Sequence, residues 1–335
     1  MTIKDISALT GYSVGTISRA LNNQPNVSEK ARTTILRVAA EKGFQLNVNA
    51  KQLKQQHGNS ILVMVKGTSN DLFSSLVEAI QARMGDGKYP LIVEYMDEAE
   101  NEILRALRLC AEKKPLGILF LGGNRENFLK DFDKISMPCV LVTNDASGMG
   151  FPNLSSVSLD NRKAAAMAID HLVSLGHKKI AVIGGNRDKS DTTLLRYQGC
   201  LDTFSRHGIA FDEDLDYETV RFSFAGGYKA AKHLLETGRE FTGIFAMSDV
   251  MAIGAIRALQ DAGRMVPEDV SVVGFDGLEV GAYTVPRLTT VVQSVEMLAA
   301  HSIRLLLEQL EESQAPHYET VSVTLAQKES TRKVD

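Results

Sequence analysis

Apolar residues near the start of the chain recur at helical spacing in three short runs, over positions 3–9, 14–21 and 31–39. In chain order, these apolar positions are Ile3, Ile6, Leu9, Val14, Ile17, Ala20, Leu21, Ala31, Ile35, Val38 and Ala39. Gly11 falls between the first two runs, and Ser28 is placed to cap the third helix. Two short helices joined at a glycine are typical of a helix-turn-helix, whose second helix enters the DNA major groove. The same pattern also fits an ordinary helical hairpin, so this stretch alone leaves both interpretations open.

From residue 60 onward, short apolar runs alternate with amphipathic helical patterns in two successive series. The first series predicts strands at 61–65, 91–95, 117–121 and 139–143, and helices near 72–84, 100–113 and 125–134. The second predicts strands at 180–184, about 217–221, 243–247 and 270–274, and helices near 161–175, 191–207, 225–237 and 249–262. Apolar strands that alternate with helices specify parallel sheets covered on both faces, so we expect two doubly wound lobes.

Three further segments complete this pattern. The stretch at 144–160 contains Gly, Pro, Asn and Ser without periodicity, and we interpret it as a crossing between the lobes. A helix at 295–311 and strands at 321–323 and 324–326 follow, and one of these is expected to return to the first lobe. The last residues, ESTRKVD, are expected to fray.

The composition is that of a globular protein, with 44% hydrophobic and 23% charged residues among 335. No apolar run approaches the roughly 20 residues that span a bilayer, and the opening MTIKDISALT lacks the apolar part of a secretory signal. Cys110, Cys139 and Cys200 are widely spaced and fit neither a disulfide framework nor a zinc site. We therefore expect a cytoplasmic protein with reduced, buried thiols.

Charge is distributed unevenly along the chain. Residues 1–58 hold eight Lys and Arg against three Asp and Glu, a net charge of +5, and the overall charge of −4 leaves −9 for the remainder. A basic head on an acidic body suggests that the head meets a polyanion, although a solvated basic face has the same composition. No phosphate-binding or nucleophile-elbow motif is present and the seven His are scattered, so we expect no enzyme, no cofactor and no metal site.

Several segments resemble the lactose/galactose-repressor (LacI-type) family of bacterial transcription regulators. TIKDISALTGYSVGTISRALNN, NVSEKARTTILRVAAEKGF and NVNAKQL are similar to that family's DNA-binding head and hinge. DNRKAAAMAIDHLVSLGHKKIAVIGG, MSDVMAIGAIRALQDAGRMVPEDVSVVGFDG and LTTVVQ are similar to its core. The resemblance extends from Thr2 to about Thr331, and several independent motifs in the right order make it specific.

The resemblance implies an all-α helix-turn-helix head plus an α/β periplasmic-binding-protein-like core of two doubly wound parallel-sheet lobes. It assigns the DNA-binding domain to 1–46, the hinge helix and linker to 47–59, and the effector-binding and dimerisation core to 60–331. Within that core, lobe 1 is expected at about 60–158 plus a C-terminal crossing segment, and lobe 2 at about 161–290 plus terminal strands.

The family's function then follows as an expectation. A homodimer binds a palindromic operator, and a small molecule in the cleft between the lobes controls it allosterically. No leucine heptad follows residue 311, which favours a dimer over a tetramer. A sugar or sugar phosphate is the expected effector, a purine or nucleoside is the alternative, and a sugar-binding protein without DNA function is the least favoured interpretation. The sequence leaves open whether the effector releases DNA or promotes binding.

The resemblance also assigns residues to DNA. Arg19 is the best candidate for reading a base edge, because its fork matches the two guanine acceptors, although it also suits a phosphate. Leu53 is expected to wedge into the minor groove, and the alternative is an unstructured linker. Leu46 and Lys51 depart from the Pro and Arg common in the family. The complete set expected to contact DNA is Thr2, Ser13, Val14, Gly15, Thr16, Ser18, Arg19, Asn22, Asn47, Ala50 and Leu53.

The effector is expected at the carboxyl ends of the strands, where the two lobes face each other. Carboxylates and an arginine suit paired hydroxyls, and aromatic faces cover the C–H face of a sugar ring. The expected set is Asn70, Phe73, Asp145, Arg196, Phe222, Asp249, Asp276 and Gln293. Arg196 matches the family's principal effector-binding arginine, whereas Asp249 also suits a helix cap and Phe73 also suits the core.

Overall fold

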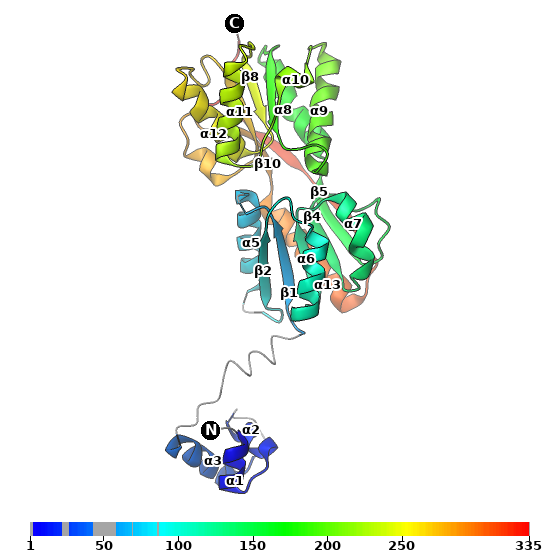
Figure 1. Ribbon diagram of the computed structural model, residues 1–335, viewed down its shortest axis with the longest axis vertical. Coiled ribbons are helices and arrows are strands. Elements are labelled where there is room, and N and C mark those ends of the chain that lie inside the picture. Colours follow the sequence, from blue (N-terminus) through cyan, green and yellow to red (C-terminus); the bar gives the residue numbers. More distant parts are fainter. Residues whose placement is uncertain (1–2, 22–26, 43–57, 69, 86, 335) are drawn as a thin grey trace. The chain divides into compact units, whose positions relative to one another are not determined.

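The computed structural model describes residues 3–21, 27–42, 58–68, 70–85 and 87–334. The chain divides into two compact units, Met1–His57 and Gly58–Asp335, which we call the head and the core (Figure 1). The finer boundaries expected at residues 46, 59 and 331 stay predictions. The expected DNA-contacting residues outside the described ones are Thr2, Asn22, Asn47, Ala50 and Leu53, together with the side chain of Ser18.

The described part of the head contains three helices, α1 (Ile3–Thr10), α2 (Val14–Leu21) and α3 (Glu29–Glu41). One isoleucine from each helix is fully buried, namely Ile6, Ile17 and Ile35. These side chains form a small shared core, as the helical spacing predicts. Gly11 turns the chain between α1 and α2 at a φ of +70°, a conformation that favours glycine. Ser28 caps α3 as expected, because its hydroxyl accepts a hydrogen bond from a first-turn N–H at 3.3 Å.

The first lobe of the core is built on an all-parallel sheet with the order β11-β5-β4-β3-β1-β2. Its strands are β1 (Ile61–Lys66), β2 (Leu91–Met96), β3 (Gly117–Leu121), β4 (Cys139–Thr143), β5 (Leu154–Leu159) and β11 (Tyr318–Val321). Its helices are α5 (Asp71–Met84), α6 (Glu102–Lys113), α7 (Arg125–Asp131), η1 (Phe132–Lys134) and α13 (Val295–Glu312). Along β1, Ile61, Val63 and Val65 pack towards α5 and α13, whereas Leu62 and Met64 pack towards α6 and α7. Both faces of the sheet are therefore covered.

The second lobe has a sheet of order β12-β10-β9-β8-β6-β7, in which only the β10–β12 pair is antiparallel. Its strands are β6 (Ile180–Gly184), β7 (Tyr217–Thr219), β8 (Gly243–Ala246), β9 (Ser271–Asp276), β10 (Thr289–Gln293) and β12 (Val323–Ala326). Its helices are α8 (Asn161–Ser174), α9 (Asp191–His207), α10 (Glu213–Asp216), α11 (Phe224–Glu236), α12 (Asp249–Asp261) and η2 (Glu279–Ala282). Helices α8 and α9 pack on one face and α11 and α12 on the other (Figure 1).

The chain passes between the lobes at three places, β5 to α8, β10 to α13, and β11 to β12. The predicted return to the first lobe is confirmed, because α13 and β11 both belong to it. The prediction for 144–160 is only half right, since Leu154–Leu159 is a fully buried strand and the crossing begins after it. The strand was not predicted because three of its six residues are serines, which interrupt the apolar run. Two of them accept backbone hydrogen bonds, Ser155 from the His317 N–H and Ser156 from the Ala146 N–H.

The prediction that the C-terminal residues fray is wrong. Ser330 is fully buried, and its hydroxyl donates to the Val272 carbonyl at 2.6 Å and accepts from the Thr289 N–H at 2.8 Å. Thr331 lies 3.0 Å from the His171 ring. The segment is polar, yet these hydrogen bonds hold it against the second sheet.

Two other expectations concern thiols and membranes. Cys139 and Cys200 are buried and Cys110 is partly buried, and burial raises the pKa of all three thiols. Among the residues that the structure describes, no helix is both long and apolar enough to cross a membrane.

Candidate functional site

Helix α2 of the head presents a mixed surface. Ile17 and Ala20 are buried, whereas Val14, Gly15 and Arg19 are exposed on the outer side of the helix. The Arg19 Nε–H donates to the Gly15 carbonyl at 3.3 Å, which uses one of the five donors of the guanidinium. The remaining donors fit a guanine edge or a phosphate.

Ser13 caps the start of α2. Its Oγ accepts a hydrogen bond from the Thr16 backbone N–H at 3.2 Å, and the two hydroxyls lie 2.9 Å apart. This pair therefore fixes the helix start in the free protein.

A cleft of about 480 Å³ lies in the core and is lined by residues of both lobes, a volume in the usual range for small-molecule sites. The polar and charged residues that line it are Lys66, Thr68, Asn70, Asp97, Glu98, Thr143, Asn144, Asn186, Lys189, Ser190, Thr192, Arg196, Arg221, Ser223 and Asp276. Phe73 and Phe222 contribute aromatic faces from opposite lobes. Such a lining suits a ligand with many hydroxyls and an apolar ring face.

Arg196 is held rigidly in the wall of this cleft. Its Nε–H donates to the Asn161 side-chain oxygen at 2.9 Å, and Nη1 donates to the Met247 carbonyl at 2.6 Å. The guanidinium lies 3.6 Å from the centre of the Phe275 ring. Burial lowers the pKa of Arg196 to about 10, so the group stays charged at neutral pH.

Asp276 is the last residue of β9 and directly follows Phe275. It has a φ of +126° and accepts a hydrogen bond from the Gln293 side-chain amide at 2.7 Å. Burial raises the pKa of Asp276 to about 8, against the opposing effect of the Arg196 charge. Thr143 takes a φ of +79° at the end of β4 in the other lobe. Backbone strain therefore occurs on both walls of the cleft, as is common at ligand sites.

Five of the eight residues expected to bind effector line the cleft together, namely Asn70, Phe73, Arg196, Phe222 and Asp276. Gln293 is buried behind Asp276 and acts on it through the hydrogen bond described above. Phe73 is 7% exposed, so it belongs to the first-lobe core as well as to the cleft wall. Asn70 also caps α5.

The structure places Asp145 and Asp249 outside the cleft lining. Asp145 accepts hydrogen bonds from the N–H and hydroxyl of Ser147, at 2.9 and 2.6 Å, and stabilises its own turn. Asp249 is fully buried and accepts from the Leu278 N–H at 2.7 Å and the Thr290 hydroxyl at 2.5 Å. Burial raises the pKa of Asp249 to about 6. Its contact with Leu278 holds the loop that follows Asp276 at the end of β9.

Sequence reasoning missed the charged residues that line the cleft beside this set. Lys66 and Asp97 lie at or just after the ends of β1 and β2, and Arg221 follows β7. The sequence could have indicated these three residues, because each lies at or shortly after the end of a strand. Arg221 of the second lobe pairs with Asp97 at 2.9 Å and Glu98 at 2.6 Å in the first.

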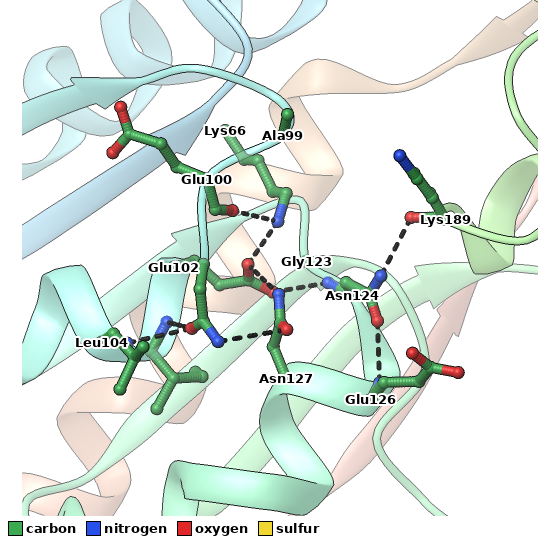
Figure 2. Close-up of polar contacts among 12 residues, drawn as sticks. Lys66, Ala99, Glu100, Glu102, Leu104, Gly123, Asn124, Glu126, Asn127 and Lys189 are labelled. Atoms are coloured by element: carbon green, nitrogen blue, oxygen red, sulfur yellow. Dashed lines mark hydrogen bonds and ion pairs between the residues drawn. The ribbon is translucent and has the colours of Figure 1, made fainter.

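A buried polar network supports Lys66 (Figure 2). Glu102 is fully buried and forms an ion pair with the Lys66 ammonium. The same carboxylate accepts hydrogen bonds from the Asn124 N–H at 2.5 Å and the Asn127 amide at 2.9 Å. The Asn124 side chain in turn donates to the Lys189 carbonyl of the second lobe at 3.1 Å. The network therefore joins the cleft wall to a contact between the lobes.

Comparison with known proteins identifies the family. Residues 2–47 match the sequence model for bacterial regulatory proteins of the lacI family, and residues 169–331 match that for a periplasmic binding protein-like domain. The transcriptional regulator MalR of Clostridium butyricum is 33% identical over 309 residues, which cover 91% of this chain and 92% of MalR. The chain belongs to the lacI family. The family and fold class predicted from the sequence are therefore confirmed, and this lacI-family chain is a DNA-binding transcriptional regulator.

Two further relatives of this lacI-family chain span its whole length. GalR of Escherichia coli K12 is 31% identical over 338 residues, which cover 98% of this chain and 95% of GalR. The solved complex of the regulator CelR with cellobiose is 26% identical, with a TM-score of 0.70, and the match covers 98% of this chain and 99% of CelR. Head and core therefore occur in one chain in these relatives too.

Proposed function

We propose that this regulator binds a palindromic operator as a homodimer and that a sugar or sugar derivative in the cleft controls the binding. The observation that carries the proposal is the convergence of Arg196, Asp276 and two aromatic faces in a cleft between the lobes. The solved relative CelR holds cellobiose, which supports the ligand class. Repressor rather than activator action is the expected direction.

The proposed coupling rests on the way the lobes are joined. Three chain segments cross between the lobes, so a ligand that contacts both walls changes their relative orientation. The change passes to the segment 47–59, which we propose to be the hinge. Coupling between two binding sites is reciprocal, so operator DNA changes the effector affinity by the same factor.

For the DNA side, we propose that Arg19 reads a base edge and that Val14 and Gly15 allow close approach to the groove. Their exposure on one side of α2 supports this. Leu53 is proposed as the minor-groove wedge on sequence grounds alone. With so few polar groups on α2, DNA shape and the hinge contribute the remaining selectivity.

We also propose that the protein is not an enzyme and that it acts in the cytoplasm, where its DNA target lies. The relatives MalR and GalR are named as transcriptional regulators, which supports the first statement. Arg196 and Asp276 each have a hydrogen-bonding role that needs no turnover.

Deleting residues 1–58 tests the two-part organisation. The shortened protein should lose operator binding, measured by fluorescence anisotropy, and should bind sugar with nearly unchanged affinity, measured by calorimetry. The full chain is the control in both assays. Loss of both activities in a folded core would contradict the proposal.

A further inference from the structure

We propose that the effector is uncharged, so that a neutral sugar binds in the cleft and its phosphate ester is rejected. This inference rests on the proposed function, because it assumes that the cleft takes a sugar. The inference narrows the proposed function by distinguishing a neutral sugar from its phosphate ester. It is supported by the pairing of cationic and anionic side chains within the cleft. The cationic residues that line the cleft are Lys66, Lys189, Arg196 and Arg221.

Arg221 is already engaged by two carboxylates. Its Nη2 donates to both oxygens of Asp97 at 2.9 Å, and its Nε donates to Glu98 at 2.6 Å. All three residues line the cleft, and together they carry a net negative charge. A phosphate placed beside Arg221 therefore meets two carboxylates at close range, and like charges in contact oppose binding.

The positive charge of Lys66 is also balanced by a carboxylate, in this case a buried one. Its ammonium forms an ion pair with Glu102 and donates to the Glu100 carbonyl at 2.9 Å (Figure 2). The Glu102 side chain is 1% exposed, so this charge is weakly screened by water. Lys66 keeps a third donor for a hydroxyl, but the pair as a whole is neutral.

Two donors of Arg196 are already used within the protein. Its Nε donates to the Asn161 side chain and its Nη1 to the Met247 carbonyl, and Asp276 is the ionisable group that acts on it. Asp276 lines the same cleft. A sugar hydroxyl can accept from the guanidinium and also hydrogen-bond to the Asp276 carboxyl group, whose raised pKa lets it donate or accept.

The helix starts around the cleft are also occupied. One first-turn N–H group of each of α5, α9 and α11 donates to a capping side chain, namely that of Asn70, Ser190 or Ser223, and these three residues all line the cleft. Helices α5 and α9 also carry Asp71 and Asp191 in their first turns. These carboxylates offset the positive ends of the helices, so neither helix offers a vacant phosphate cradle.

Among the described residues that line the cleft, Lys189 and Arg196 are the cations without a carboxylate within ion-pair distance. Lys189 is exposed, and exposed lysines are strongly hydrated. The four cations face the three carboxylates of Asp97, Glu98 and Glu102, so one positive charge at most is left uncompensated. A single charge does not balance a phosphate dianion beside Asp97 and Glu98. The charge distribution therefore selects a neutral ligand.

Calorimetry on the full-length protein with matched pairs tests the inference. The probes are maltose and maltose 6′-phosphate, glucose and glucose 6-phosphate, adenosine and AMP, and inorganic phosphate alone. In any pair that binds, the neutral member should bind at least about tenfold more tightly. Tighter binding of a phosphorylated member, or binding of inorganic phosphate, would overturn the inference. Binding of the adenosine pair in place of both sugar pairs would overturn the proposed sugar ligand, and the charge rule would then be judged on that pair.

A double variant tests the physical cause. Asp97→Asn with Glu98→Gln leaves Arg221 without carboxylate partners, so the preference for the neutral member should narrow several-fold and inorganic phosphate should now bind. Asp202→Asn is the matched control, because it frees Arg162 outside the cleft lining and should leave the preference unchanged. An unchanged preference and no phosphate binding in the double variant would show that charge compensation does not set the selectivity.

Discussion

Arg221 and Asp97 join the two lobes beside the cleft, since one guanidinium nitrogen, Nη2, donates to both carboxylate oxygens at 2.9 Å. The residues are 124 positions apart in sequence and lie in the loops after β7 and β2. A second set of contacts joins the lobes, because the Arg125 N–H donates to Asp191 at 3.0 Å. The lobes are thus held by contacts that form only when they approach each other.

Arg221→Ala should speed ligand release several-fold, because it removes an ion pair that bridges the lobes. Thermal stability should change little, since exposed ion pairs contribute little to folding. Stopped-flow fluorescence with the bound sugar measures the release rate. Arg162→Ala, which breaks the exposed pair with Asp202 within the second lobe, is the control. An unchanged release rate in Arg221→Ala would mean that this pair does not hold the lobes together.

Arg19→Ala should weaken operator binding by about 1–3 kcal/mol and relax the preference for one base pair. Fluorescence anisotropy on operators that differ at each position measures both effects. Arg37→Ala is the control within the head, because Arg37 is exposed on α3 and pairs with Glu41 at 2.7 Å. A uniform loss across all operator variants would assign Arg19 to a phosphate instead.

Glu102→Ala should lower the free energy of unfolding by about 3–5 kcal/mol, because it leaves the Lys66 ammonium without its buried partner. Glu102→Gln should cost less, since its amide oxygen still accepts from the Asn124 N–H. Urea unfolding measures the difference. Glu78→Ala on the exposed side of α5 is the matched control. If all three variants lowered the free energy of unfolding by the same small amount, Glu102 would not stabilise the fold through Lys66.

Lowering the pH should destabilise the packing of the C-terminal segment, because His171, which contacts Thr331, becomes protonated. Burial lowers the pKa of His171 below the value of about 6.5 that histidine has in the unfolded chain. The folded protein therefore binds a proton at His171 less tightly than the unfolded chain does. The unfolded state therefore binds more protons as the pH falls through this window, and stability is lost from about pH 7 to pH 5. The midpoint of thermal unfolding should fall over that range, and less so in His171→Gln.

The exposed His317 provides the control for this pH experiment. His317→Gln should keep the full pH dependence of the unmodified protein. His177, whose pKa burial also lowers, contacts the Arg332 carbonyl at 3.2 Å and contributes with the same sign. A pH dependence that is identical with and without His171 would contradict this assignment.

Apolar periodicity sufficed for most of the fold, because strands such as Ile61–Lys66 are continuous apolar runs between clear helices. It failed at Leu154–Leu159 and at Ser330, where buried hydroxyls replace apolar contacts with hydrogen bonds to distant backbone. A polar residue in a sequence does not reveal whether its partner lies in solvent or 58 residues away.

The same limit applies to the site. Arg196 and Asp276 lie at the cleft as their motifs implied, because Asp276 ends β9 and Arg196 lies in the first half of α9, and both placements are local properties. The ion pair of Arg221 with Asp97 depends on how the two lobes meet, and no local pattern encodes that. Asp145 follows a strand in the expected way but turns its carboxylate to Ser147.

The central claim is that the cleft controls the head, and reciprocal coupling tests it most directly. Operator affinity is measured with and without saturating sugar, and sugar affinity with and without a palindromic site selected from random double-stranded DNA. The account predicts that both affinities change by the same factor, and that Arg196→Ala abolishes the sugar effect while operator binding persists. An operator affinity that is unchanged at saturating sugar would contradict the account.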